Sequence, residues 1–133
     1  MTMAEVQDSI LADLIELNDP LSRAEYAIAC ARQAEILPDE LRTDSAQVAD
    51  CQANTWVIAQ WENDRLCFRA DSESFLVKGM LALIREIYEG RTRQEIESFS
   101  CLLPDAPTTA DLLTPEQRRG LRSILSQLSK GMS

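Results

Sequence analysis

A run of β-branched and aromatic residues near the middle of the chain, at residues 54–62, constrains the fold more than any other feature. Such residue types fit a pleated, half-buried surface and are enriched in strands. Asn63 and Asp64 follow, and both tolerate the positive φ angles of a two-residue hairpin turn. Residues 65–69 then alternate between apolar and polar side chains, so the sequence predicts two antiparallel strands. The strand-forming side chains of the first run are Thr55, Trp56, Val57, Ile58 and Trp61.

A shorter segment with weak alternation, residues 47–49, precedes this hairpin, and residues 50–54 are polar or small, as in a turn. We therefore expect a three-stranded antiparallel sheet with Cys51 at a loop tip, a common position for reactive residues. On spacing alone, Cys51 could equally be an unreactive residue in a turn, since free cysteine is more often a small buried hydrophobe. Trp56 is a large aromatic on the first long strand and is expected to be buried.

Apolar residues at helical spacing flank the predicted strands on both sides. Because helices precede and follow an antiparallel sheet, the predicted fold class is α+β, with the helices on one face of the sheet. The length suits one domain, residues 1–133. The predicted helices are residues 3–17, a second that ends before Pro38, residues 75–88, residues 92–98 and a last one from Pro115.

Two details of the predicted helical segments carry structural expectations. Gly79 lies inside the apolar helix, where glycine costs up to about 1 kcal/mol relative to alanine. It indicates close approach by another backbone, for which the sheet is one candidate, although simple tolerance of glycine is an equal alternative. Residues 100–113 contain two prolines and are expected to form a loop.

The charge balance limits the partners that this chain can have. The net charge is −9, which disfavours nucleic acid and anionic membranes and favours a protein partner with a basic surface. Residues 1–11 are acidic and lack the long apolar core of a signal peptide, and no apolar run reaches the length of a membrane span. We expect a cytoplasmic protein.

The chain has four cysteines and no histidine. Without histidine there can be no Ser-His or Cys-His nucleophile pair. The four cysteines form no Cys-x-x-Cys pair, which a zinc site or a thioredoxin-type site would use. Neither a metal nor a cofactor is therefore expected. Cys30 and Cys101 fall on apolar stripes and are interpreted as core residues. Cys67 lies between Arg65 and Arg69 on one strand face, where positive charge could favour a thiolate, although a structural role is the favoured interpretation.

Four short motifs, in the same order along the chain, resemble those of the SufE-type sulfur acceptors of iron–sulfur cluster assembly. The resemblance extends from about residue 20 to residue 128. The family has Gly-Cys-Gln-Ser-x-Val-Trp, Asp-Ser-Asp/Glu followed by Ile-Val-Lys/Arg-Gly-Leu, an earlier Leu-Pro, and a late Ser/Thr-x-Ser-Arg-x-x-Gly-Leu. The matching segments here are residues 50–56, residues 71–73 with residues 76–80, Leu37 with Pro38, and residues 114–121.

The resemblance implies an IscU-like fold and a sulfur relay. Cys51 would take sulfur from the persulfide of a SufS-like cysteine desulfurase, stimulate that enzyme and pass the sulfur to a cluster scaffold. The pyridoxal phosphate of such a system belongs to the desulfurase; the acceptor itself would be a carrier rather than an enzyme, and it could be a homodimer. The resemblance implies that the loop and partner contacts are Asp50, Gln52, Lys78, Arg118 and Arg119.

The chain also departs from the family pattern. Asp50 replaces glycine, Ala53 and Thr55 replace serine and valine, and Gln117 replaces arginine. A carboxylate beside Cys51 is expected to disfavour its thiolate. Two alternatives therefore stay open: an iron–sulfur scaffold of IscU-like fold, and a regulatory module that binds a desulfurase without carrying sulfur.

Overall fold

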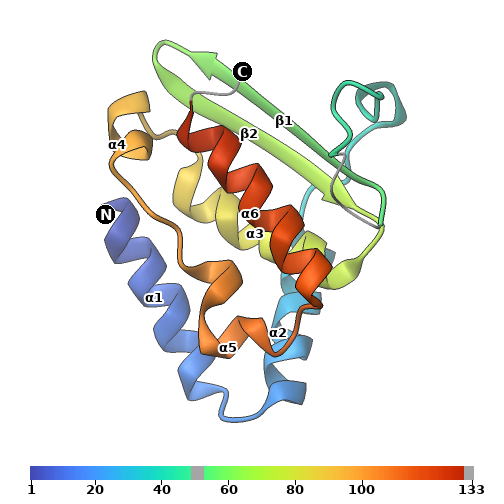
Figure 1. Cartoon of the computed structure of the whole chain (residues 1–133), viewed down its shortest axis with the longest axis vertical. Helices are drawn as coiled ribbons and strands as arrows, with labels where there is room; N and C mark the ends of the chain where they lie inside the picture. The colour runs from blue at the N-terminus through green and yellow to red at the C-terminus, as the bar shows by residue number, and fades with distance from the viewer. Residues whose placement is uncertain (49–52, 131–133) are drawn as a thin grey trace.

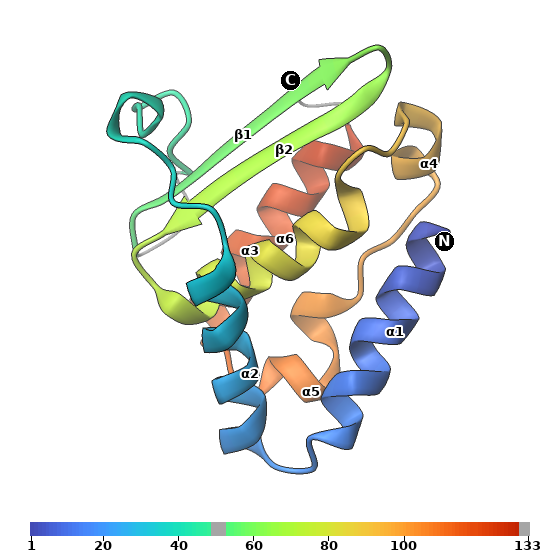
Figure 2. The ribbon, with the colours of Figure 1, turned by 180° about the vertical axis from the view of Figure 1, so that it is seen from behind.

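The structure, a computed structural model, describes residues 1–48 and 53–130. Both views place the β-hairpin at one side of the molecule, with α3 and α6 next to it and α1 and α5 further away (Figures 1 and 2). No helix within these ranges is both long and apolar enough to cross a bilayer. The elements in chain order are α1 (Met3–Glu16), α2 (Pro20–Gln33), a 3₁₀ turn (Asp39–Leu41), β1 (Thr55–Glu62), β2 (Arg65–Ser72), α3 (Phe75–Tyr88), α4 (Arg93–Glu97), a 3₁₀ turn (Leu103–Asp105), α5 (Pro107–Ala110) and α6 (Pro115–Ser129).

The predicted hairpin is confirmed. β1 and β2 pair antiparallel from Thr55 opposite Ser72 to Glu62 opposite Arg65. Asn63 and Asp64 form the connecting turn, with φ angles of 53° and 63°. Two consecutive positive φ angles are the signature of a type I′ turn, whose twist matches that of the strands it joins.

The prediction of a three-stranded sheet is wrong for the described residues, which form a sheet of two strands. Gln47 makes only an isolated antiparallel bridge to Trp56. The amide of Gln47 and that of Ala46 both donate to the carbonyl of Thr43, at 3.1 Å each. Because this turn uses backbone groups that a strand would direct to its neighbour, only a short segment remains to pair with β1.

The helix-facing side of the hairpin carries the main core. Val57 and Ala59 of β1 and Leu66 and Phe68 of β2 belong to the same buried cluster as the apolar faces of α3 and α6.

The predicted helix over residues 75–88 is confirmed as α3; Ser74 is its N-cap, and Gly90 follows its C-terminus with φ of 78°. The predicted loop at residues 100–113 instead contains α5 and a 3₁₀ turn. The α+β class is confirmed.

Trp56 is buried, as predicted, with 8% of its surface exposed. It lies on the opposite face of the hairpin from the core residues Val57 and Ala59, since neighbouring residues of a strand point to opposite faces. The guanidinium of Arg42 covers its ring at 4.8 Å from the ring centroid. The chain before β1, rather than a helix, therefore contributes to the burial of this tryptophan.

Gly79 is the point where α3 touches α2. A Cβ atom at this position would lie 2.2 Å from the carbonyl oxygen of Ala27, a contact that real Cβ atoms do not make. A close backbone approach therefore explains the glycine, and the approaching element is helix α2 rather than the sheet.

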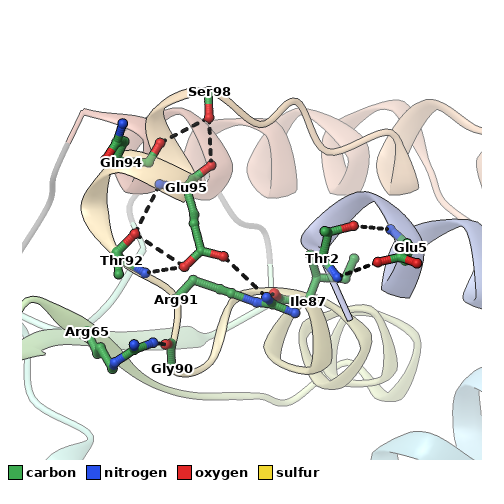
Figure 3. A network of polar contacts seen from close by, with 10 residues as sticks. All are labelled: Thr2, Glu5, Arg65, Ile87, Gly90, Arg91, Thr92, Gln94, Glu95 and Ser98. Atoms are coloured by element: carbon green, nitrogen blue, oxygen red, sulfur yellow. Dashed lines mark hydrogen bonds and ion pairs between the residues drawn. The ribbon is translucent and has the colours of Figure 1, made fainter.

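The turn end of the hairpin is tied to the chain between α3 and α4 (Figure 3). Arg65 donates to the carbonyl of Gly90 at 2.8 Å, and the amide of Leu66 donates to the carbonyl of Arg91 at 2.9 Å. Thr92 then caps α4 in a reciprocal capping box with Glu95. This end lies far along both strands from the residues that flank Cys51, so the hairpin is anchored independently at its two ends.

Candidate functional site

The predicted reactive segment begins and ends beside the first residues of β1. Asp50, Cys51 and Gln52 lie outside the described residues, but Val48 and Ala53 on either side are described. The amide of Val48 donates to the carbonyl of Thr55 at 2.8 Å, and the amide of Val57 donates to the carbonyl of Ala46 at 2.9 Å. The chain before Cys51 and the chain after it are thus held side by side. We call the four residues that make these two hydrogen bonds, Ala46, Val48, Thr55 and Val57, together with the residues that contact them, the loop base.

Exposed side chains join the loop base to the start of α3. Gln47 donates through Nε2 to Oδ1 of Asn54 at 2.8 Å, and Asn54 donates through Nδ2 to Oε1 of Glu73 at 3.0 Å. The amide of Glu73 returns a hydrogen bond to the carbonyl of Asn54 at 2.9 Å. Glu73 belongs to a segment matched by the SufE resemblance, and the structure places it directly beside the chain that follows Cys51.

A buried hydroxyl pair lies beneath these residues. Oγ1 of Thr55 and Oγ of Ser72 are 2.8 Å apart, and Thr55 also donates to the carbonyl of Ala53 at 3.1 Å. Thr55 is fully buried. The hydroxyl of Ser72 accepts the amide of Ser74 at 3.2 Å, which links the pair to the N-cap of α3. Threonine in place of the family's valine therefore adds hydrogen bonds, and the departure does not disrupt the loop base.

Asp71 is the buried carboxylate with which two cations pair next to the loop base, Arg42 and Lys78. Its Oδ2 accepts the amide of Leu37 at 3.1 Å and Nη2 of Arg42 at 2.7 Å. Its Oδ1 accepts the amide of Ser72 at 2.8 Å and lies 3.2 Å from Nζ of Lys78. Burial by itself would raise the pKa of Asp71, but the hydrogen bonds from Leu37, Ser72 and Lys78 outweigh it and hold that pKa below the ordinary value. Asp71 is therefore ionised and connects three segments.

Two of the positions singled out from the sequence contact residues that lie just before α3. Lys78 is committed to the ion pair with Asp71, and only 12% of its side chain is exposed. Gln117, which replaces the family's arginine, completes the capping box of α6 and donates to Oγ of Ser74 at 3.4 Å. Gln117 is therefore connected to the loop base through Ser74.

The two arginines that follow Gln117 are placed differently. Arg118 is half-buried and donates through Nη1 to the carbonyl of Ala110 at 3.1 Å, which fastens α6 to α5. Arg119 is exposed on α6. Their predicted partner contacts, like those of Asp50 and Gln52, stay predictions.

Cys67 does not have a thiolate-favouring environment. Burial raises the pKa of its thiol, and the carboxylates of Glu89 and Glu62 raise it further, against the opposing effect of Arg69 and Arg85. Arg69 is itself paired with Glu35 at 2.7 Å. Burial and the neighbouring acidic side chains therefore outweigh the positive charge of Arg69 and Arg85, so these cations do not favour a Cys67 thiolate.

The other two described cysteines are also poor nucleophiles. Burial raises the pKa of Cys30, and the nearby carboxylate of Glu86 adds to the effect. Burial raises the pKa of Cys101 to about 11. Both residues are partly buried and pack against the main core, whereas their apolar surroundings in the sequence predicted core residues. At neutral pH very little of either thiol is in the reactive thiolate form.

A groove of about 470 Å³ runs between α2, β2 and α3, with Cys30, Phe68 and Lys78 among its lining residues. The three cations on its wall have partners: Lys78 pairs with Asp71, Arg69 with Glu35 and Arg85 with Glu89. In the described ranges no three His, Cys, Asp or Glu side chains come together as a metal site would require.

Arg42 is the residue of this site that sequence reasoning missed. It lies in a charged, irregular stretch that resembles an ordinary surface connection. Its contacts with Trp56 and Asp71 come from residues far along the chain, so local pattern could not indicate them. The nearest signal was the Leu-Pro pair just upstream, which marks the same turn.

Comparison with known proteins gives consistent matches. The family model SufE, described as an Fe-S metabolism associated domain, matches residues 8–132. The sulfur acceptor protein CsdE of Escherichia coli is 31% identical over 123 residues, which cover 91% of this chain and 82% of CsdE. The cysteine desulfuration protein SufE of Wigglesworthia glossinidia brevipalpis is 30% identical over 108 residues, covering 79% of this chain and 74% of that protein.

The fold is matched as well. The solution structure of a hypothetical protein from Thermus thermophilus superimposes with a TM-score of 0.71 and covers 96% of this chain and 93% of that one. Its sequence is 19% identical, so this likeness concerns the fold alone.

Proposed function

Because this chain belongs to the SufE family, we propose that it is a sulfur acceptor that takes persulfide sulfur from a cysteine desulfurase onto Cys51. The observation that carries the proposal is the family match over residues 8–132, which includes the cysteine and the residues of the loop base. Two relatives are named as a sulfur acceptor and as a cysteine desulfuration protein. The raised pKa values of Cys30, Cys67 and Cys101 support Cys51 as the carrier, because they make the other thiols less reactive.

The proposed transfer is a thiol–disulfide exchange in which sulfane sulfur is the cargo. Cys51 loses its proton to solvent, and its thiolate attacks the outer sulfur of the persulfide on the desulfurase. A new S–S bond forms on Cys51 as the old one breaks, and the electron pair leaves with the thiolate of the desulfurase cysteine, which solvent can protonate. No external oxidant or reductant is consumed, and no general base within the acceptor is required.

The chemistry assigns the cofactor to the partner. A desulfurase needs pyridoxal phosphate to release sulfur from cysteine, whereas the acceptor supplies only a thiolate and a surface that fits the enzyme. Asp50, Gln52, Lys78 and the arginines at the start of α6 are the proposed contacts on that surface. We propose that the chain works in the cytoplasm as a carrier and activator, and that a cluster scaffold receives the sulfur.

A non-relay regulatory module is the second candidate. Two substitutions favour it: Asp50 beside the cysteine and Gln117 in place of arginine. Such a module would bind and stimulate a desulfurase without gaining sulfur.

The test uses four single Cys→Ser variants, each incubated with a cysteine desulfurase and cysteine and examined by intact mass. The wild type and the variants of Cys30, Cys67 and Cys101 should each gain one sulfur atom, and Cys51→Ser should gain none and fail to stimulate turnover. If Cys67→Ser loses the adduct and Cys51→Ser keeps it, the carrier is Cys67 on β2 and the assignment to Cys51 is wrong. Stimulation of the enzyme without any adduct on the wild type would establish the regulatory module instead.

A further inference from the structure

One side chain before the reactive segment, that of Arg42, touches both strands of the hairpin. Its Nη2 lies 2.7 Å from Oδ2 of Asp71 on β2, and its guanidinium carbon lies 4.8 Å from the ring centroid of Trp56 on β1. Its Nε donates to the carbonyl of Leu37 at 3.0 Å. Arg42 therefore joins the two ends of the turn at residues 37–42 and attaches that turn to both strands of the sheet.

The contacts of Asp71 strengthen this attachment. The same carboxylate oxygen that accepts Arg42 also accepts the amide of Leu37 at 3.1 Å. Asp71 is 1% exposed, so these charge-assisted hydrogen bonds are shielded from solvent. The turn at residues 37–42 is thus held at its first and last residues by one buried carboxylate.

A second turn, at residues 43–47, connects the anchored turn at residues 37–42 to the chain before Cys51. Residues 43–47 follow Arg42 directly, and the amides of Ala46 and Gln47 both donate to the carbonyl of Thr43. Within this turn the carbonyl of Ala46 accepts the amide of Val57, and just beyond it the amide of Val48 donates to the carbonyl of Thr55. No residue intervenes between Arg42 and this hydrogen-bonded turn, so displacement of Arg42 would displace the strand-like contact of Val48.

The geometry requires an arginine. A guanidinium is a planar fork that can donate from Nε to one acceptor and from Nη2 to another while its face stacks on an aromatic ring. Lysine carries the same charge as a point donor on a flexible stem, and it cannot reproduce all three contacts at once.

We infer that Arg42 is a positioning residue for sulfur acceptance: it holds residues 37–48 against the hairpin and so fixes where the chain before Cys51 leaves the sheet. This inference rests on the proposed function only in its consequence for transfer; the anchoring itself can be tested separately.

The anchoring is tested by amide hydrogen exchange on the full chain. In Arg42→Gln, the amides of Val48 and Val57 should lose protection by about tenfold, because the bonds they make depend on the anchored turn. The amides of Leu66 and Gly90, which bond to each other's segments at the far end of β2, should keep theirs. Arg42→Lys should fall between Arg42→Gln and the wild type.

The consequence for transfer is tested by the initial rate of sulfur loading from a desulfurase. Arg42→Gln should load about fivefold more slowly, since misplacement of a reacting group by a fraction of an ångström lowers reactivity. Arg69→Gln is the charge-matched control: it removes a cation of β2 that pairs with Glu35 at the surface, and it should load at the wild-type rate. Leu128→Ala is the stability control, because it opens a cavity in α6 that is remote from the loop base.

The outcomes separate the two claims. Unchanged protection of Val48 in Arg42→Gln, or equal protection in Arg42→Lys and the wild type, would overturn the positioning role. Wild-type loading by Arg42→Gln, or slowed loading by Leu128→Ala to the same degree, would overturn its importance for transfer. Failure of the wild type itself to gain sulfur would refute the proposed function and leave the exchange measurements to decide the anchoring.

Discussion

The carboxylate of Asp71 is the residue on which the loop base depends most. Asp71→Asn keeps the shape of the side chain but removes the charge that faces Arg42 and Lys78. Because its charge is lost, two partly buried cations, Arg42 and Lys78, are left without compensation, and we expect a loss of about 3 kcal/mol in the free energy of unfolding at pH 7. Urea denaturation measures it. Glu35→Gln, which breaks the exposed pair with Arg69, serves as the control and should cost less than about 1 kcal/mol.

The same carboxylate predicts a pH dependence. Despite its burial, hydrogen bonds hold the pKa of Asp71 below the ordinary value, so the folded state binds its proton less readily than the unfolded state. Its stabilising effect is complete above the unfolded pKa of about 4 and is lost as pH falls through the lower folded pKa. The free energy of unfolding should therefore decline more steeply below about pH 4 in the wild type than in Asp71→Asn. Parallel acid limbs for the two proteins would contradict this.

The described cysteines give a third prediction at the residue scale. Because burial raises the pKa of Cys101 to about 11, its alkylation should continue to accelerate up to that pH. Alkylation of Cys30 and Cys67 should also be slow at neutral pH, since their pKa values are raised. Iodoacetamide labelling followed by peptide mass mapping measures each site. Labelling of Cys67 as fast as Cys51 at pH 7 would argue against Cys51 as the only reactive thiol.

At the scale of elements, the hairpin turn offers a substitution with a predictable sign. Asp64 has φ of 63°, a conformation that costs a residue with a side chain but costs glycine nothing. Asp64→Gly should therefore stabilise the protein by about 0.5 to 1 kcal/mol, and Asp64→Ala should destabilise it. The exposed pair of Asp64 with Arg93, at 3.7 Å, is lost in both variants and so cancels in the comparison. Thermal unfolding of the two variants measures the difference.

Elements with local signals could be predicted from the sequence. The apolar face of α3, the positive-φ pair at residues 63 and 64 and the capping box of Thr92 with Glu95 all depend on neighbours within a few residues. The third strand was overpredicted because alternation at residues 47–49 does not reveal that a turn ending at Gln47 uses its backbone groups. Gly79 signalled a close approach, but only the packed structure identifies α2 as the partner.

The sequence indicated which residues belong to the candidate site better than it indicated the contacts among them. The family motifs gathered Asp71, Glu73 and Lys78, and the structure brings all three to the loop base. Arg42 escaped notice because its two partners on the sheet are 14 and 29 residues away, at Trp56 and Asp71. Contacts over such separations arise from the fold and have no periodic signature.

At the scale of the whole molecule, charge predicts how this protein meets its partner. The net charge of −9 produces a negative electrostatic potential that attracts a protein with a basic surface. Long-range attraction of this kind accelerates association more than it strengthens the bound complex. Salt shortens the reach of that field, from a Debye length of about 10 Å at 0.1 M to about 3 Å at 1 M.

We therefore expect the bimolecular rate constant for sulfur loading from a desulfurase to fall by about tenfold as sodium chloride rises from about 0.05 to 0.5 M. The control is alkylation of Cys51 by neutral iodoacetamide in the same buffers, which needs no charged encounter and should change little. Charge reversal of exposed acidic residues remote from the loop base, such as Glu97→Lys, should lower the low-salt rate and flatten its salt dependence. A loading rate that rises with salt would mean that the partner presents an acidic or apolar surface, and the electrostatic account of recognition would then be wrong.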